Sequence, residues 1–245
     1  MNDQHQKVAI ITGAGRGMGA VIAERLARDG ISVVVNYASS ADAAEALVAR
    51  IEAQGGRALP AQADVSDPAQ VARMFENVVA ALGGVDILVN NAGIMPVGML
   101  ADFDDASFNR LIDTNLKGSF NTMREASRRL RDGGRVVNFS SSVVGLYQPS
   151  FGIYAATKAA IEALTVVMAR EMAGRNITVN AVAPGPVQTE LLSHSPQPVL
   201  DNLARMTPLG RLGQPADIAS VIAFLAGEGG GWINGQTIRV NGGII

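Results

Sequence analysis

A tyrosine and a lysine four residues apart have the clearest capacity for acid–base chemistry in this chain. Tyr154 and Lys158 stand at the start of a strong helical pattern, where a separation of four places both side chains on one helix face. A phenol titrates near pH ~10, but an ammonium about 4 Å away at an effective dielectric near 20 favours its ionised form by about 4 kcal/mol. The pair therefore predicts a tyrosine that exchanges a proton with a substrate, assisted by the lysine.

A glycine-rich segment near the amino terminus has the composition of a phosphate-binding turn. It reads Thr12-Gly13-Ala14-Gly15-Arg16-Gly17-Met18-Gly19-Ala20, between an apolar run and a helical pattern. Glycines let the backbone approach a pyrophosphate, and the start of a helix offers free N–H groups and a favourable dipole. The order of strand, glycine turn and helix predicts a dinucleotide site; the alternative is a tight turn that binds nothing.

The residues after the second and third apolar runs indicate which nucleotide is bound. An acid after the second run would bind the ribose 2′-hydroxyl and repel a 2′-phosphate, and Asn36-Tyr37-Ala38-Ser39-Ser40 contains none. Arg16 can approach the same ribose. We therefore expect NADP(H) to be preferred, with NAD(H) possible and a solvent-facing Arg16 as the alternative. Asp64 and Val65 are expected at the adenine, unless Asp64 is a helix cap beside Ser66.

Seven short β-branched runs alternate with amphipathic stretches. The runs are continuously apolar, which indicates strands buried on both faces, as in a parallel sheet covered by helices on each side. This predicts an α/β fold, a single doubly wound, Rossmann-type domain over residues 1–245 with a seven-stranded parallel sheet and helices on both faces. The expected strands are 8–12, 32–36, 57–63, 85–90, 135–139, 177–182 and 237–240, and the expected helices 17–29, 41–54, 69–82, 107–131, 154–173 and 215–226.

Composition excludes several classes of function. A net charge of -2 with dispersed Lys and Arg is unlike the basic patch of a nucleic-acid or membrane-surface binder. The absence of cysteine excludes disulfides, zinc–thiolate sites and thiol nucleophiles, and we expect no metal site. The chain shows no signal-peptide layout, and we expect no stretch long enough to span a bilayer. These features predict a cytoplasmic protein whose partner is a small molecule.

The segment 184–208 breaks the alternation of strands and helices. It contains five prolines and only a patchy helical pattern near 199–206. Long excursions in a compact domain are usually functional, and this one follows a strand end, where open α/β sheets bind ligands. We expect a substrate lid at about 188–207. The substrate pocket is expected to include Met95, Val97, Leu146, Tyr147 and His194.

Together these motifs resemble those of the short-chain dehydrogenase/reductase family. The glycine turn follows the family spacing Thr-Gly-x-x-x-Gly-x-Gly, Asn91-Ala92-Gly93 matches its Asn-Ala-Gly stretch, and Tyr154 with Lys158 matches its Tyr-x-x-x-Lys. The resemblance extends over nearly the whole chain, through 184–189 to the closing glycines at 242–243. It implies an NAD(P)-dependent enzyme acting on CH–OH or C=O groups.

The resemblance also implies individual roles. It implies a catalytic tetrad of Asn115, Ser141, Tyr154 and Lys158, in which the serine orients the substrate oxygen and the asparagine holds a water linked to the lysine. Ser141 lies thirteen residues before Tyr154, while Ser142 opens a Ser-x-x-Gly run and stays an alternative. The expected cofactor contacts are Gly13, Arg16, Gly17, Met18, Gly19, Asn36, Ala38, Ser39, Asp64, Val65, Asn91, Ala92, Gly93, Tyr154, Lys158, Pro184, Gly185, Val187 and Thr189.

These features predict an NADPH-dependent oxidoreductase that reversibly reduces a ketone to an alcohol. The resemblance favours a bacterial-type carbonyl reductase. The alternative is a 3-oxoacyl-acyl-carrier-protein reductase, in which Arg124, Arg128, Arg129 and Arg131 would meet an acidic carrier protein instead of forming a solvated helix face. A protein that senses NADP without catalysis is a third reading. The resemblance also implies a homotetramer formed through the two long helices and the carboxyl-terminal strand.

Overall fold

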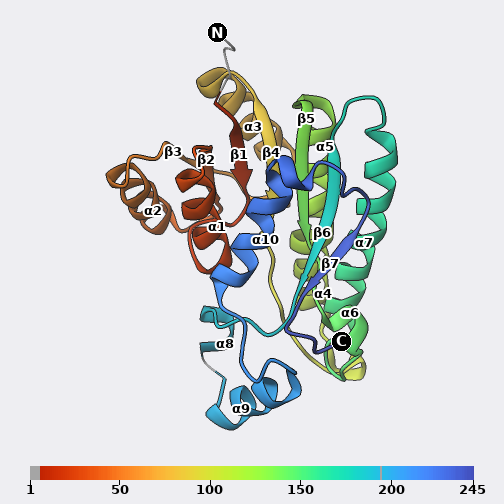
Figure 1. Ribbon diagram of the computed structural model, residues 1–245. Helices are drawn as coiled ribbons and strands as arrows, with labels where there is room; N and C mark the ends of the chain where they lie inside the picture. The colour runs from red at the N-terminus through yellow and green to blue at the C-terminus, as the bar shows by residue number, and fades with distance from the viewer. Residues whose placement is uncertain (1–5, 194) are drawn as a thin grey trace.

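A parallel sheet of seven strands runs through the centre of the computed structural model, which describes residues 6–193 and 195–245 (Figure 1). The strands lie in the order β3-β2-β1-β4-β5-β6-β7, so all seven expected strands and the fold class are confirmed. The order reverses between β1 and β4, the place where open α/β sheets bind ligands. The strands are β1 (Val8–Ile11), β2 (Ser32–Tyr37), β3 (Ala58–Gln62), β4 (Val85–Asn90), β5 (Leu130–Phe139), β6 (Thr178–Pro184) and β7 (Thr237–Val240).

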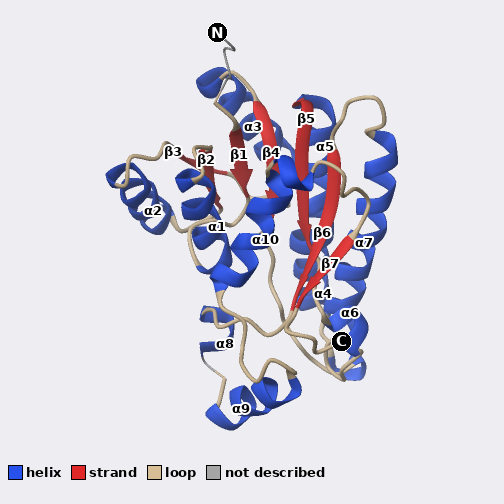
Figure 2. Cartoon of the chain, in the orientation of Figure 1, coloured by secondary structure: helices blue, strands red, loops and turns tan. Residues whose placement is uncertain are grey.

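Alternate residues of each central strand feed two separate apolar layers. In β1, Ala9 and Ile11 pack in one layer with α1, α2 and α10, and Val8 and Ile10 pack in the other with α3, α5 and α7. All four residues are buried, which is why the run is continuously apolar. Figure 2 shows helices on both sides of the strands. These helices are α1 (Gly17–Arg28), α2 (Ala41–Ala53), α3 (Pro68–Leu82), α5 (Gly118–Arg129), α7 (Gly152–Glu171) and α10 (Pro215–Ala226).

Helix α3 begins and ends where local chemistry dictates. The Asp67 carboxylate accepts hydrogen bonds from the backbone N–H groups two and three residues on, at 2.8 and 3.1 Å, and Pro68 fills the first turn. Gly83 ends the helix in the left-handed conformation at φ 80°. The cap is thus Asp67 and not Asp64 or Ser66, because Asp64 accepts hydrogen bonds from Ser66 instead.

The helix expected over 107–131 is divided in the structure. A wide π-helical turn interrupts it and turns the buried Asn115 toward the sheet. The helical part ends before 130, because Leu130 already pairs with Val85 as the first residue of β5. The segment consists of α4 (Asp105–Leu111), the π-helical turn (Ile112–Lys117) and α5.

The lid segment is more helical than its prolines suggest. It contains α8 (Glu190–Ser193) and α9 (Gln197–Met206). After α9, Arg211 forms a 2.7 Å ion pair with Asp217 in the first turn of α10. His194, expected in the pocket, lies outside the described residues. The remaining short helices are α6 (Val143–Leu146) and the 3-10 turns Leu100–Asp102 and Glu228–Gly230.

Among the described residues, α7 is the one helix with the length and apolar composition of a membrane span. The expectation that no stretch is long enough was therefore wrong for this helix. The core helix of a soluble protein passes the same test. Helix α7 carries the Tyr154–Lys158 pair and packs on β5 and β6, so its apolar inner face has a place in the fold.

Candidate active site

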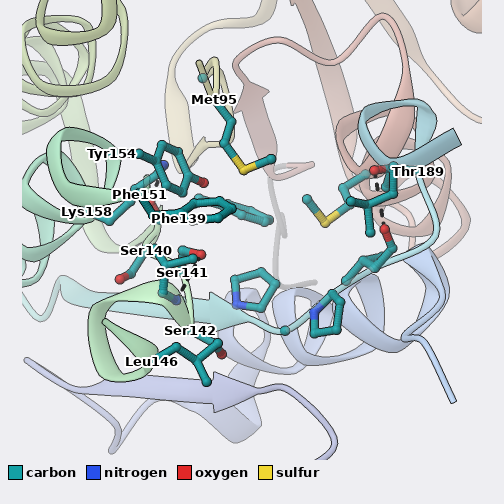
Figure 3. A pocket seen from close by; sticks show the side chains of 18 of the residues that line it. Met95, Phe139, Ser140, Ser141, Ser142, Leu146, Phe151, Tyr154, Lys158 and Thr189 are labelled. Carbon is teal, nitrogen blue, oxygen red and sulfur yellow. Dashed lines mark hydrogen bonds between the residues drawn. The ribbon is translucent and has the colours of Figure 1, made fainter. Parts of the chain in front are cut away.

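Three of the four residues expected to do chemistry, Ser141, Tyr154 and Lys158, line one cavity of about 210 Å³, and Asn115 does not (Figure 3). Its walls come from the segments that follow β4, β5 and β6 and from the first turns of α7. Tyr154 and Lys158 lie on one side of the cavity and Thr189 lies across from them. Parallel strands bring segments distant in the sequence to one sheet edge, which is how these side chains come together.

Burial dominates the ionisation of Tyr154. It raises the pKa of the phenol to about 12, and a hydrogen bond from the Ser141 hydroxyl only partly opposes the rise. The Lys158 ammonium lies 5.7 Å from the centre of the Tyr154 ring. The sequence predicts that Lys158 favours the ionised phenol, but in the protein alone burial is the largest influence on the Tyr154 pKa, because it removes the phenolate from water. Tyr154 is thus protonated at neutral pH and able to give a proton.

Lys158 is buried and held by the strand end. Its Nζ donates to the Phe139 carbonyl at 2.9 Å, and burial lowers the pKa of Lys158 to about 8. No carboxylate forms an ion pair with it among residues 6–193 and 195–245. The ammonium is therefore the predominant form at neutral pH and becomes neutral in mildly alkaline solution.

The three consecutive serines after β5 have different partners. Ser140 donates to a Glu162 carboxylate oxygen at 2.6 Å. Ser142 is buried, donates to a backbone carbonyl of β6 at 3.4 Å and accepts from the Asn241 amide at 3.1 Å. Of the three serines, only Ser141 forms a side-chain hydrogen bond with the Tyr154 phenol. The geometry therefore favours Ser141 over the alternative Ser142 as the serine that faces a substrate oxygen.

We expect Ser141→Ala to lower kcat/KM for a ketone about 100-fold, because it removes the hydroxyl that positions the reacting oxygen. The matched variant Ser142→Ala should lower kcat/KM less than about tenfold, because that hydroxyl bonds to protein groups only. Steady-state kinetics of both variants would check the assignment, and the reverse ranking would make Ser142 the substrate-facing serine.

Asn115 connects the π-helical turn to the loop after β4. Its side chain accepts from the Ile94 N–H and donates to the Ile94 carbonyl, both at 2.9 Å. Its backbone carbonyl accepts from the Ser119 hydroxyl at 2.8 Å. Asn115 thus holds the loop that carries Gly93 and Ile94 in the cavity wall, and the water relay implied by the resemblance stays a prediction.

Two asparagines hold the glycine turn in shape. The Asn91 amide donates to the Thr12 and Gly13 carbonyls at 2.9 and 3.0 Å, and the Asn36 carbonyl oxygen accepts from the Gly13 N–H at 3.2 Å. A Cβ on Gly19 would lie 2.6 Å from the Asn91 amide nitrogen, so only glycine fits there. The glycines at 13 and 19 are thereby explained by close packing of the turn.

The free N–H groups at the start of α1 fit a pyrophosphate. The backbone N–H groups of Gly17, Met18 and Gly19 have no partner among the described residues, and the side chain of Arg16 forms no cap. A Cβ added to Gly17 would meet nothing within 4 Å, which leaves open space over the turn. Unpaired donors at a helix start beside open space match the chemistry of a dinucleotide diphosphate.

The ribose end differs in one respect from the expectation. Asn36 is buried, and its amide nitrogen donates to the Ala61 and Ala63 carbonyls, so its polar atoms are occupied by the protein. Its side chain therefore supports the turn rather than offering a free donor to the nucleotide. Arg16, in contrast, is 74% exposed and forms a 3.6 Å ion pair with Glu190 of the lid.

The remaining expected contacts divide into loop residues and cavity residues. Ala38, Ser39 and Asp64 are exposed beside the strand ends, and Val65 is buried with its carbonyl bonded to the Asn121 amide, a contact the sequence did not predict. Ala92 has its N–H bonded to the Thr12 hydroxyl. The expected residues that line the cavity are Met18, Asn91, Gly93, Tyr154, Lys158, Pro184, Gly185, Val187 and Thr189.

The pocket wall expected from the sequence is partly wrong. Met95 and Leu146 line the cavity, but Val97 and Tyr147 do not and are exposed instead. Tyr147 is 79% exposed because it ends α6 in the left-handed conformation, at φ 47°, and points away. Leu192 and Leu203 line the cavity from the segment expected as a lid. Lining residues that sequence reasoning missed include the apolar Ile94, Phe151 and Ile244 and the polar Gln148, whose residue types alone carry no signal of a site.

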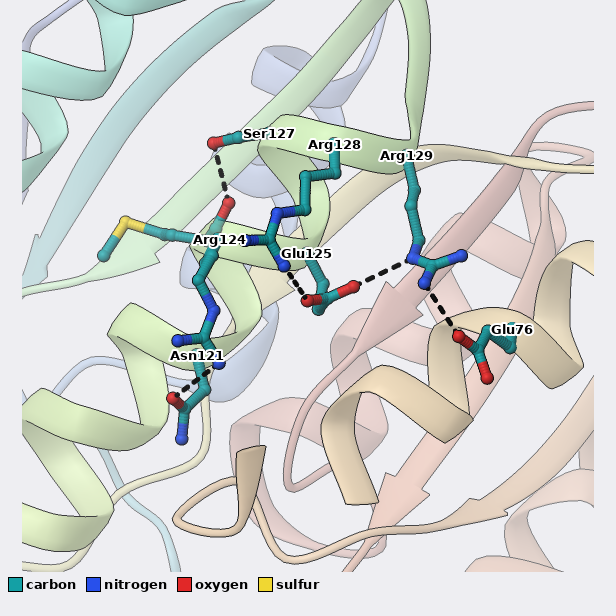
Figure 4. A network of polar contacts seen from close by, with 8 residues as sticks. Glu76, Asn121, Arg124, Glu125, Ser127, Arg128 and Arg129 are labelled. Atoms are coloured by element: carbon teal, nitrogen blue, oxygen red, sulfur yellow. Dashed lines mark hydrogen bonds and ion pairs between the residues drawn. The ribbon is translucent and has the colours of Figure 1, made fainter. Parts of the chain in front are cut away.

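The arginines near the end of α5 are occupied by neighbouring groups (Figure 4). Glu125 accepts from Arg128 at 3.0 Å and from Arg129 at 2.8 Å, and Arg129 also bonds to Glu76. Arg131 lies in β5 and pairs with Asp86. Arg124 stacks over Phe120, 5.2 Å from the ring centre. The four cations therefore do not form one free basic surface.

Comparison with known proteins agrees with the fold. A family profile described as enoyl-(acyl carrier protein) reductase matches residues 13–245. A 3-oxoacyl-[acyl-carrier-protein] reductase of Staphylococcus epidermidis is 42% identical over 97% of this chain and 98% of its own. The crystal structure of a short-chain dehydrogenase of Burkholderia cenocepacia in complex with NADP has a TM-score of 0.92 and 37% identity, covering 99% of both chains. A short-chain dehydrogenase/reductase of Serratia marcescens has a TM-score of 0.94 and 37% identity over 98% of both chains. The chain belongs to the short-chain dehydrogenase/reductase family of oxidoreductases.

Proposed function

We propose that this protein is an NADPH-dependent carbonyl reductase that reversibly converts a ketone to an alcohol. The observation that carries the proposal is the hydrogen-bonded pair of Ser141 and a protonated, buried Tyr154 in a cavity that continues toward Met18 and the open glycine turn. When bound, the nicotinamide supplies or accepts the hydride. The protein must then place a carbonyl carbon beside it and deliver a proton to the oxygen.

Each catalytic side chain has a distinct part in this proposal. The Ser141 hydroxyl donates to the substrate carbonyl oxygen and orients it, and Tyr154 gives its proton to that oxygen. The Lys158 ammonium stabilises the phenolate that Tyr154 leaves behind, and its bond to Phe139 keeps it in place. Asn115 positions the adjacent loop and belongs to the proton relay that the family resemblance implies.

The cofactor preference rests on charge at the ribose end. The strand-end segment after β2 contains no acid, and Arg16 of the glycine turn is exposed. Two solved relatives are complexes with this nucleotide, the B. cenocepacia enzyme with NADP and a blue fluorescent protein from a metagenomic library with NADPH. We therefore expect NADP(H) to bind more tightly than NAD(H), which remains a usable cofactor.

Arg16→Ala should weaken NADPH binding about 10- to 100-fold and change NADH binding less than about threefold, because only NADPH carries the 2′-phosphate that the guanidinium pairs with. Titration of both cofactors by nicotinamide fluorescence would measure the two dissociation constants. Arg28→Ala, at the far end of α1, is the matched control and should leave both unchanged. Equal weakening of both cofactors would contradict the assignment of Arg16.

A 3-oxoacyl-acyl-carrier-protein reductase is the second candidate, favoured by the 42% identical S. epidermidis relative. The paired state of Arg128, Arg129 and Arg131 speaks against a carrier-protein surface at that place. Absorbance of NADPH with small ketones, ketoesters and a carrier-linked 3-oxoacyl thioester separates the candidates. Fast turnover of small ketones supports the first. Much faster, salt-sensitive turnover of the carrier-linked substrate supports the second, and tight NADPH binding without turnover supports a sensor.

A homotetramer is part of the proposal, and so is a cytoplasmic location. Val167 on α7 and Phe120 on α5 expose apolar side chains, and Trp232, beside β7, is 98% exposed. Large exposed apolar groups on two faces are typical of protein interfaces.

The two faces predict a graded response to charge. Val167→Glu should halve the tetramer to a dimer, because it places a carboxylate in one apolar contact and leaves the other. Light scattering at micromolar concentration would measure the mass. A wild-type monomer under these conditions would refute the tetramer.

A further inference from the structure

Most of the cavity lining is apolar. Met95 follows β4, Leu146 ends α6, Leu203 comes from the lid helix α9, and Ile244 comes from the segment after β7. Four separate segments therefore contribute apolar side chains to the cavity lining. Such a lining binds carbon chains or rings and offers nothing to a charged group.

Charged side chains are missing from the cavity wall with one exception. Lys158 is the single Lys, Arg, Asp or Glu that lines the cavity within the described part of the chain. Its ammonium already donates to the Phe139 carbonyl and lies behind the Tyr154 ring. A substrate carboxylate placed against Met95 or Leu146 would thus lose water without gaining a cation, which is strongly unfavourable.

One amide stands out in this apolar wall. Gln148 lies between α6 and α7, is half-buried and lines the cavity. Its side-chain amide has no hydrogen-bond partner among the described residues. Asn91, the other amide of the wall, spends its donors on the glycine turn. The Gln148 amide can therefore still donate to and accept from a neutral polar group in the cavity.

We propose that the substrate is an uncharged ketone with an apolar substituent and a second neutral hydrogen-bonding group, such as an ester, which Gln148 recognises. The inference rests on the proposed reductase function and narrows it. It makes Gln148 a specificity-determining residue and excludes keto acids as good substrates. A site with a placed hydrogen-bonding group discriminates against analogues that lack the partner.

Three matched ketones test the proposal with NADPH as the reductant. Methyl 4-oxopentanoate is the neutral ester, 4-oxopentanoate is its carboxylate, and heptan-2-one replaces the ester group with methylenes. We expect kcat/KM for the carboxylate to be at least about 100-fold below that for the ester. We expect kcat/KM for heptan-2-one to be about 3- to 10-fold below that for the ester, because heptan-2-one lacks the one hydrogen bond with Gln148.

Variants at one position separate recognition from hydrophobicity. Gln148→Leu should reduce the ratio of ester to heptan-2-one about 3- to 10-fold, and Gln148→Arg should raise kcat/KM for 4-oxopentanoate about tenfold or more. Gln54→Leu, an exposed glutamine at the end of α2, is the control and should leave both ratios unchanged. NADPH titration of each variant verifies that the cofactor site is intact.

The outcomes distinguish the proposed substrate class from the proposed carbonyl reductase function. Reduction of the ester and the carboxylate at similar rates would overturn the proposed substrate class while the reductase function stands. An unchanged ester-to-ketone ratio in Gln148→Leu would remove Gln148 from recognition. No turnover of any of the three ketones, with NADPH bound, would count against the carbonyl reductase function itself.

Discussion

Tyr154→Phe is expected to lower kcat for ketone reduction about 10³- to 10⁴-fold, with NADPH affinity changed less than about threefold. The substitution removes one oxygen and keeps the ring that packs in the cavity wall. It deletes the proton donor and the partner of Ser141 together. The decay of NADPH absorbance at saturating ketone would measure kcat, and fluorescence titration would measure the affinity.

A second tyrosine supplies the control for this loss. Tyr147 lies seven residues earlier and is 79% exposed. Tyr147→Phe should keep kcat within about twofold, because its hydroxyl contacts nothing in the cavity. Near-normal turnover in Tyr154→Phe would contradict the assignment of Tyr154 as proton donor. Loss of NADPH binding would show that the substitution disturbs the folded cofactor site and not only the chemical step.

Lys158→Met is expected to abolish most turnover and yet to stabilise the folded chain. The ammonium that favours the Tyr154 phenolate is lost, so kcat should fall about 100-fold or more. Burial lowers the pKa of Lys158 from 10.5 to about 8, which corresponds to about 3 kcal/mol of folding free energy spent on burying the charge. Methionine fills similar space without charge, so the variant avoids this cost. The Phe139 carbonyl loses its hydrogen-bond donor in the variant, which reduces the stabilisation by about 1 kcal/mol.

The size of the stability effect depends on pH. Below pH ~8 both folded and unfolded chains carry the Lys158 proton, so the wild type bears the full cost of burial. Between about 8 and 10.5 the folded chain releases the proton first, and this cost declines as pH rises. Thermal unfolding should therefore show a higher Tm for Lys158→Met at pH ~7 and a smaller difference at pH ~10. A lower Tm at neutral pH would mean that the lysine is structurally required.

The same pKa predicts the alkaline limit of wild-type reduction. Since Tyr154 stays protonated up to about pH 12 while Lys158 becomes neutral near 8, the decline of kcat/KM above pH ~8 belongs to the lysine. A plot of kcat/KM against pH would measure this decline, which would be absent near pH ~8 if the reaction depended on the ionisation of Tyr154 alone.

Local patterns explain why much of the fold was predictable. The continuous apolar run of β1 is a local property that reports burial on both faces. The Tyr154–Lys158 spacing places both on one face of α7 through helix geometry alone. The glycine turn was recognisable because close backbone packing and a positive φ at 61° leave Gly13 no substitute.

The features that the sequence did not show have a different origin, in contacts between segments far apart in the sequence. Asn36 was expected at the nucleotide, but its amide bonds to β3 and to the glycine turn. The arginines of α5 and β5 were weighed as a carrier-protein surface against a solvated helix face, and in the structure Glu125, Glu76 and Asp86 pair with three of them. The prolines of the lid concealed α9, because proline is tolerated in a first helical turn.

The sequence by itself determined the order of strands and helices, the glycine turn and the Tyr154–Lys158 pair, because each depends on neighbours within a few residues. The tertiary structure alone decided that Ser141 rather than Ser142 faces Tyr154, since Asn241 occupies Ser142. It also decided the direction of the Tyr154 pKa. The sequence spacing shows that the Lys158 ammonium can attract the Tyr154 phenolate. Whether the phenolate is favoured over the phenol also depends on how much water the surrounding fold removes from it.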